Sequence, residues 1–102
     1  MLALSVRFDL RDAASAEEFD RLTAAVVEQI RKREPGTLLY STGTVTDAPF
    51  SRIFFEVYRD AAAREEHERQ PHVLRFHAAK DPLLVGKRVE QVTLGTAKGL
   101  PA

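Results

Sequence analysis

The sequence predicts an α+β fold in which helices cover one face of a four-stranded antiparallel sheet. Four segments have the alternation or the β-branched and aromatic composition of strands. One longer segment carries an apolar stripe at helical spacing, and a second region contains helix-capping residues and a helix-starting proline. The segments follow one another in the order β-α-β-β-α-β, which is typical of a split βαβ domain.

The most informative stretch is residues 51–77, where a strand runs directly into a helical region that holds all 3 histidines. The side chains of the strand divide between two faces, with Phe54, Glu56 and Tyr58 on one and Ile53, Phe55 and Val57 on the other. Because both faces are largely apolar, both must be covered. The strand is therefore predicted to be central in its sheet.

The first strand and the first helix are predicted at residues 2–10 and 15–33. Apolar side chains share one face of this strand, at Leu4, Val6, Phe8 and Leu10. Ser15 and Glu18 have the spacing of a capping box, so the helix is expected to begin near Ser15. Basic residues in the last turn suit a helix C-terminus, and Pro35 cannot continue the helix.

A hairpin follows the first helix. Residues 37–45 are rich in Thr, Leu and Tyr without a helical stripe, which favours a strand. Residues 46–49 carry turn chemistry before the next strand begins at Ser51. The second and third strands are therefore predicted to be neighbours.

The second helical region is predicted to be broken in two. Asp60 is a suitable cap for a helix over residues 61–70, and Pro71 suits the first position of a following helix. Residues 87–95 then supply the last strand, and residues 96–102 form a tail.

This order predicts a ferredoxin-like, single-domain fold over residues 1–102, with the first and third strands in the middle of the sheet. If both helical regions cover one face, Ile53, Phe55 and Val57 would face water on the other. We therefore expect a homodimer that forms through the sheet faces.

Composition narrows the classes of partner and site. Fifteen basic and fifteen acidic residues cancel, which argues against nucleic acid as a partner. The absence of Cys excludes disulfides, thiolate metal sites and a Cys nucleophile, and no recognisable metal-binding spacing occurs. No apolar run approaches the roughly 20 residues of a membrane span, so we expect a cytoplasmic protein without a membrane partner.

Three runs of residues, in this order and spacing, resemble the antibiotic biosynthesis monooxygenase (ABM) family of dimeric α+β barrels. They are EPGTLLY at 34–40, FFEVYRD at 54–60 and HERQPHVLRF at 67–76. Members of that family include cofactor-independent oxygenases of quinols and aromatic polyketides, haem-degrading enzymes and proteins without known activity. The resemblance therefore implies the fold more firmly than the reaction.

Cofactor-independent oxidation of a phenol by dioxygen needs a base, a dry pocket and groups that hold the resulting anion. Histidine is the obvious base at neutral pH. We expect His67 and Glu56 to be catalytic, with no metal and no cofactor, acting on a quinol or polycyclic phenol. The remaining candidates are pocket residues, namely Tyr40, Tyr58, His72, Phe76, Arg7 and His77.

Each candidate also has a purely structural interpretation. His67 could be a buried hydrogen-bonding residue anchored to Glu56, and His72 could satisfy backbone groups at the helical break. Glu56 could be a structural partner of a histidine, and the tyrosines could simply pack.

Two other functions stay open. The polyketide oxygenases of the family use an Asn, Trp and Tyr set, but this chain contains no Asn and no Trp. The haem-degrading branch of the family has an Asn, a Trp and a haem-ligating His. In this chain Arg7, His67 and His77 fall near those three places, so only His77 matches the family's residue. The alternatives are thus a non-catalytic dimeric module that binds a small hydrophobic metabolite, and a haem-binding protein that uses His77.

Overall fold

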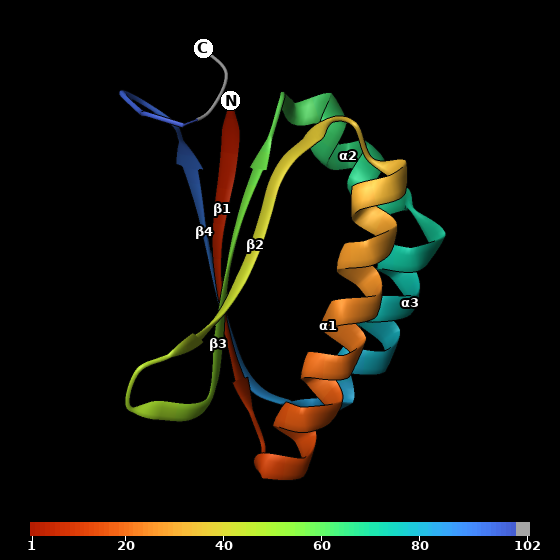
Figure 1. The fold of residues 1–102 in the computed structure, drawn as a ribbon, viewed down its shortest axis with the longest axis vertical. Coiled ribbons are helices and arrows are strands. Elements are labelled where there is room, and N and C mark those ends of the chain that lie inside the picture. Colours follow the sequence, from red (N-terminus) through yellow and green to blue (C-terminus); the bar gives the residue numbers. More distant parts are fainter. Residues whose placement is uncertain (100–102) are drawn as a thin grey trace.

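The computed structural model describes residues 1–99 as one helical layer packed on one sheet (Figure 1). The elements are β1 (Leu2–Leu10), α1 (Ala13–Arg33), β2 (Thr37–Val45), β3 (Ala48–Tyr58), α2 (Ala61–Arg69), α3 (Pro71–Lys80), a 3-10 turn η1 (Asp81–Leu83) and β4 (Leu84–Thr93). All three α-helices lie on the same side of the sheet. This arrangement confirms the predicted α+β fold class.

The sheet has the strand order β2-β3-β1-β4, and every neighbouring pair is antiparallel. β1 and β3 therefore occupy the centre, as their apolar patterns predicted. In the β1–β3 register Val6 lies opposite Phe54 and Leu4 opposite Glu56. The even-numbered residues of both strands consequently face the helices, and the odd-numbered ones face away.

The core between the two layers is built around aromatic rings. Phe8 and Phe54 from the sheet pack against Phe19 of α1, with ring centroids 4.9 to 5.7 Å apart. Phe76 of α3 packs on the same cluster, 6.0 Å from Phe19. Each of these rings is at most 4% exposed, so this cluster holds both helical regions on the sheet.

Several predicted boundaries shift in the structure. The N-cap of α1 is Asp12, whose carboxylate accepts a hydrogen bond from the Ser15 backbone N–H at 2.8 Å. The helix therefore begins close to the predicted position, but the predicted capping box of Ser15 and Glu18 is wrong. Ser15 instead lies in the first turn, where its Oγ accepts from Arg11. Asp60 caps α2 and Pro71 starts α3, as predicted.

The hairpin and the C-terminal segment also differ from expectation. β3 starts at Ala48 because Asp47, at φ 66°, makes the turn tighter than the predicted one. β4 covers Leu84–Thr93, three residues earlier at its start than expected. Of the predicted tail, residues 96–99 belong to no helix or strand, and residues 100–102 lie outside the described residues. Within residues 1–99, no helix is both long and apolar enough to cross a membrane.

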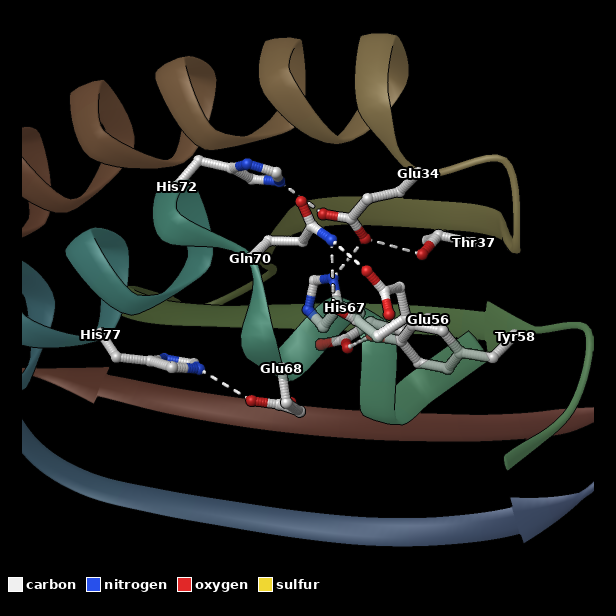
Figure 2. A network of polar contacts seen from close by, with 10 residues as sticks. Glu34, Thr37, Glu56, Tyr58, His67, Glu68, Gln70, His72 and His77 are labelled. Carbon is white, nitrogen blue, oxygen red and sulfur yellow. Dashed lines mark hydrogen bonds and ion pairs between the residues drawn. The ribbon is translucent and has the colours of Figure 1, made fainter. Parts of the chain in front are cut away.

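Glu34 joins the end of α1 to the other two helices (Figure 2). Its buried carboxylate binds His67 Nδ1 of α2 and His72 Nε2 of α3, each at 2.5 Å, and accepts from Thr37 Oγ1 of β2 at 2.8 Å. Burial raises the pKa of Glu34, but these hydrogen bonds outweigh burial and bring the pKa below the ordinary 4.5. The carboxylate is therefore ionised and acts only as an acceptor.

Gly36 lies between α1 and β2, where α2 approaches the backbone closely. A Cβ at this position would lie 2.7 Å from Ala63 Cβ and 3.2 Å from Arg59 Nη2. In contrast, a Cβ at Gly43 of β2 would meet no atom within 4 Å. The lack of a side chain at Gly36 therefore allows α2 to pack against the end of α1.

These two glycines give a matched test of the packing. We expect Gly36→Ala to lower the free energy of unfolding by about 1–3 kcal/mol because the added methyl overlaps Ala63. Gly43→Ala restricts the unfolded chain in the same way but meets no atom, so its effect should stay within about 0.5 kcal/mol. Urea denaturation followed by circular dichroism measures both. Equal effects would contradict the close packing of Gly36 on α2.

The Glu34 junction should make stability depend on pH. Because the folded-state pKa of Glu34 is depressed, its contribution is complete above the unfolded value near 4.5 and is lost as the pH falls through the folded pKa. Glu34→Gln should cost about 1–3 kcal/mol at pH 7, measured by urea denaturation. The difference from wild type should shrink below pH 4.5. A difference that is the same at pH 7 and pH 3.5 would argue against an ionised Glu34.

Candidate active site

A small cavity of about 60 Å³ lies between the sheet and the helices α2 and α3. Five of the residues predicted for the site line it, namely Tyr40, Glu56, His67, Phe76 and His77. Its other walls are supplied by Leu4, Val6, Phe8, Arg64, Glu68, Lys80, Lys87 and Val89. The cavity therefore combines an apolar floor from the central strands with an unusual number of ionisable groups.

His67 is held in this wall from several sides. It is 2% exposed, and the rings of Tyr40 and Tyr58 lie 5.5 and 5.3 Å from its imidazole. Its Nδ1 binds Glu34 and not Glu56, so the expected anchor is wrong. The reason is that Glu56 is already bonded within β3, while Glu34 reaches His67 from the end of α1.

His72 also differs from expectation, since it binds the Glu34 carboxylate and not backbone groups at the helical break. His67 and His72 thus converge on one carboxylate from two helices, which their spacing across the break did not suggest. His72 lies behind the cavity wall, between α1 and α3, and does not line the cavity.

Glu56 and Tyr58 form a buried pair next to His67. The Tyr58 hydroxyl donates to Glu56 Oε1 at 2.5 Å. Burial raises the pKa of Glu56 despite this hydrogen bond and the nearby His67, and burial together with Glu56 raises the pKa of Tyr58. Burial and Glu56 also raise the pKa of Tyr40 well above its ordinary value. Both phenols therefore stay protonated, and the hydroxyl proton of Tyr58 is already donated to Glu56.

His77 faces a different partner, since its Nε2 lies 3.2 Å from Glu68 Oε2 (Figure 2). The hydrogen bond from His77 is the main cause that lowers the pKa of Glu68. A haem ligated by His77 would need a flat apolar slot at this nitrogen. With Glu68 at Nε2 and charged residues such as Arg64 and Lys80 in the same cavity, the residues around His77 do not fit a haem.

Arg7 does not reach the cavity, which corrects its prediction as a pocket residue. As an odd-numbered residue of β1 it points to the face away from the helices. There its guanidinium lies 3.2 Å from Asp9 Oδ1 and 3.1 Å from Ser51 Oγ.

Two residues of the site were missed by sequence reasoning, although each left a signal. Glu34 sits at a helix C-terminus, where a carboxylate is unfavourable unless other groups compensate it. Lys80 follows Val73 and Phe76 at helical spacing, so it occupies the buried stripe of α3 and is 1% exposed. In both cases a charged side chain occupies a position where the charge is unfavourable, and this could have marked the residue in the sequence.

A larger hollow of about 450 Å³ lies elsewhere, between α1 and the β2 edge of the sheet. It contains no histidine, and its four charged residues are already paired, Asp20 with Arg52 at 2.8 and 3.0 Å and Glu28 with Arg31 at 3.1 Å. The smaller cavity is therefore the better candidate site because it gathers the reactive groups. Among residues 1–99, no group of three His, Asp or Glu side chains is arranged to hold a metal ion.

Comparison with known structures places this fold among many relatives. A Bacteroides thetaiotaomicron protein described as a putative antibiotic biosynthesis monooxygenase is 21% identical to this chain. It aligns with a TM-score of 0.88 over 99% of this chain and 94% of that one. A Pseudomonas aeruginosa protein is 27% identical with a TM-score of 0.84, over 93% and 94%. A Mycobacterium tuberculosis protein is 25% identical with a TM-score of 0.86, over 96% and 98%.

No curated protein matches the sequence significantly. The family description that does match is antibiotic biosynthesis monooxygenase, over residues 1–79. This match covers the first strand, the hairpin, α1, α2 and α3 up to residue 79, including every residue of the Glu34 junction. The chain therefore belongs to the antibiotic biosynthesis monooxygenase family.

Proposed function

We propose that this protein is a cofactor-independent monooxygenase that oxidises a quinol or polycyclic phenol with dioxygen. The observation that carries the proposal is the His67–Glu34 pair in the wall of a cavity that also contains Tyr40 and Phe76. Family membership supports a monooxygenase in general. The substrate and the residue roles are our own inference from the chemistry of the cavity.

The Glu34 contact selects the protonation state that a base needs. Because the ionised carboxylate only accepts hydrogen bonds, the proton of the neutral His67 ring lies on Nδ1. The lone pair is then on Nε2, for which the described residues supply no hydrogen-bond partner. His67 is therefore arranged to take a proton through Nε2, and the negative Glu34 stabilises the imidazolium that forms.

In the proposed reaction His67 removes the hydroxyl proton of the phenol, and the resulting anion supplies the electrons that dioxygen needs. One oxygen atom enters the ring and the other leaves as water, so that a phenol and dioxygen give a quinone and water. Phe76 and the central strands give the cavity apolar walls on one side, and an apolar environment strengthens the electrostatic interactions inside. Tyr40 keeps its proton and can donate to the substrate anion.

The second part of the proposal is a homodimer formed through the sheet faces. On the face away from the helices, Leu39, Ile53 and Val92 are 36%, 38% and 39% exposed around the half-buried Phe55. Strand register places Leu39 opposite Val57 and Ala3 opposite Val92. Val57 and Ala3 are 0% exposed in the single chain, so the expectation that Val57 faces water is wrong, and the exposed apolar surface consists of Leu39, Ile53, Phe55 and Val92. A second copy of the chain is the partner we propose.

The cytoplasmic location expected from the sequence also stays a prediction.

The catalytic roles can be tested by oxygen uptake with quinols and polycyclic phenols, without added metal, flavin or haem. We expect His67→Ala to reduce turnover by about two to four orders of magnitude. Glu34→Gln should also reduce it strongly, because a Gln amide that donates to Nδ1 moves the ring proton to Nε2. Lys32→Gln, at an exposed residue of α1 outside the cavity, is the control and should retain full activity.

Unchanged turnover in His67→Ala would return His67 to a structural role. Binding of a phenol without any oxygen uptake would favour the non-catalytic binding module instead. Melting curves of each variant separate a loss of chemistry from a loss of folding.

The dimer can be tested by light scattering at micromolar concentration. Wild type should have twice the chain mass, and Ile53→Lys should shift it toward the monomer because the charge would be buried between the sheets. Leu74→Lys is the matched control, since Leu74 is 54% exposed on α3, in the helical layer. A monomeric wild type would rule out this part of the proposal.

A further inference from the structure

The candidate cavity carries more positive than negative side chains. Arg64, Lys80 and Lys87 line it together with two carboxylates, Glu56 and Glu68. Both carboxylates have partners of their own, since Glu56 accepts from Tyr58 at 2.5 Å and Glu68 lies 3.2 Å from His77. Among the described residues, neither forms an ion pair with any of the three cations.

Two of these cations have unused donors. Arg64 Nε is buried and has no hydrogen-bond partner within residues 1–99, and the single bond of this guanidinium, to Gln91, is long at 3.4 Å. Arg64 also forms no ion pair within the described residues. Burying a guanidinium donor without a partner is costly, so an acceptor outside the described residues, either a water or a ligand atom, is expected at Nε.

Lys80 is more buried still, at 1% exposure. One of its three N–H donors binds Asp81 Oδ1 at 2.8 Å. The ammonium otherwise lies 5.5 Å from the ring centre of Phe8 and 5.6 Å from that of Phe76. Burial lowers the pKa of Lys80 despite its contact with Asp81, as expected for an ammonium whose hydration is incompletely replaced.

The size of the cavity limits what can satisfy these donors. About 60 Å³ is roughly the liquid volume of two water molecules, which suits the head of a ligand and not a whole ring system. Val89 lines the same cavity and is 46% exposed, so it marks an apolar rim where a ring can continue outward.

We propose that this cavity binds the carboxylate of an aromatic acid whose hydroxyl is on the adjacent carbon, with Lys80 and Arg64 as the anion-binding residues and the hydroxyl on the side of His67. The substrate class becomes a phenol that carries an acidic group, and not a neutral quinol. This inference rests on the proposed function only in that the same cavity contains His67. Anion binding itself requires no turnover and can be measured separately.

The test compares 3-hydroxy-2-naphthoate, in which the hydroxyl and the carboxylate are on adjacent carbons, with 2-naphthol, which lacks the carboxylate. Both probes fluoresce, and the chain has no Trp, so fluorescence titration under argon gives each Kd. Wild type should bind the acid about 10–100-fold more tightly, as expected for charge-assisted hydrogen bonds. Lys80→Met and Arg64→Met should each remove most of this preference while changing the Kd for 2-naphthol less than about threefold.

Lys32→Met is the matched control, because Lys32 is an exposed cation of α1 outside the cavity. Arg64 lies on α2 and is partly exposed, so Arg64→Met keeps the test valid if Lys80→Met does not fold. Lys80→Arg should keep the preference for the acid. Equal Kd values for the two probes in wild type, or a preference that survives both methionine variants, would overturn the proposal.

Admitting air to the same samples separates this inference from the oxygenase proposal. Preferential binding of the acid without oxygen uptake would leave the anion site standing and contradict the oxygenase. Oxygen uptake with 2-naphthol, together with equal Kd values for both probes, would support the oxygenase and contradict the anion site.

Discussion

A single buried carboxylate holds the helical layer together. Glu34 accepts hydrogen bonds from α2, α3 and β2 at the point where α1 ends, so all three helices meet at its two oxygen atoms. A carboxylate at a helix C-terminus is opposed by the helix dipole and by burial, and three donors compensate both effects. Removing any one donor would leave a lone pair of the charged carboxylate without a hydrogen bond in a low-dielectric region. Because this is unfavourable, the contacts of Glu34 determine how α2 and α3 lie on the sheet.

The same interaction connects fold to chemistry. By accepting from Nδ1, Glu34 fixes both the orientation and the tautomer of His67, and it leaves Nε2 as the basic atom. Around His67, burial keeps Tyr40 and Tyr58 protonated, while Lys80 and Arg64 place positive charge in the same cavity. A base that can form an anion therefore lies in the same cavity as cations that can bind that anion.

Sequence patterns were sufficient for the parts of the structure that depend on local periodicity. The two apolar faces of residues 52–58 placed β3 in the centre of the sheet, and Asp60 and Pro71 marked the helix break. Patterns failed where partners are distant in sequence. The bonds from Glu34 to His67 and His72 span 33 and 38 residues, and no spacing rule selects Glu34 over Glu56 as the partner. Asp12 displaced Ser15 as the cap because two suitable residues lay close together.

The central claim is that ionised Glu34 holds His67 in the Nδ1–H tautomer with Nε2 unprotonated. Nitrogen NMR of the histidine rings, at a pH where His67 is neutral, measures this directly. The account predicts an Nδ1–H signal for His67 in wild type and a change to the Nε2–H form in Glu34→Gln, with His77 unaffected. An Nε2–H tautomer of His67 in wild type, or no change in Glu34→Gln, would contradict it.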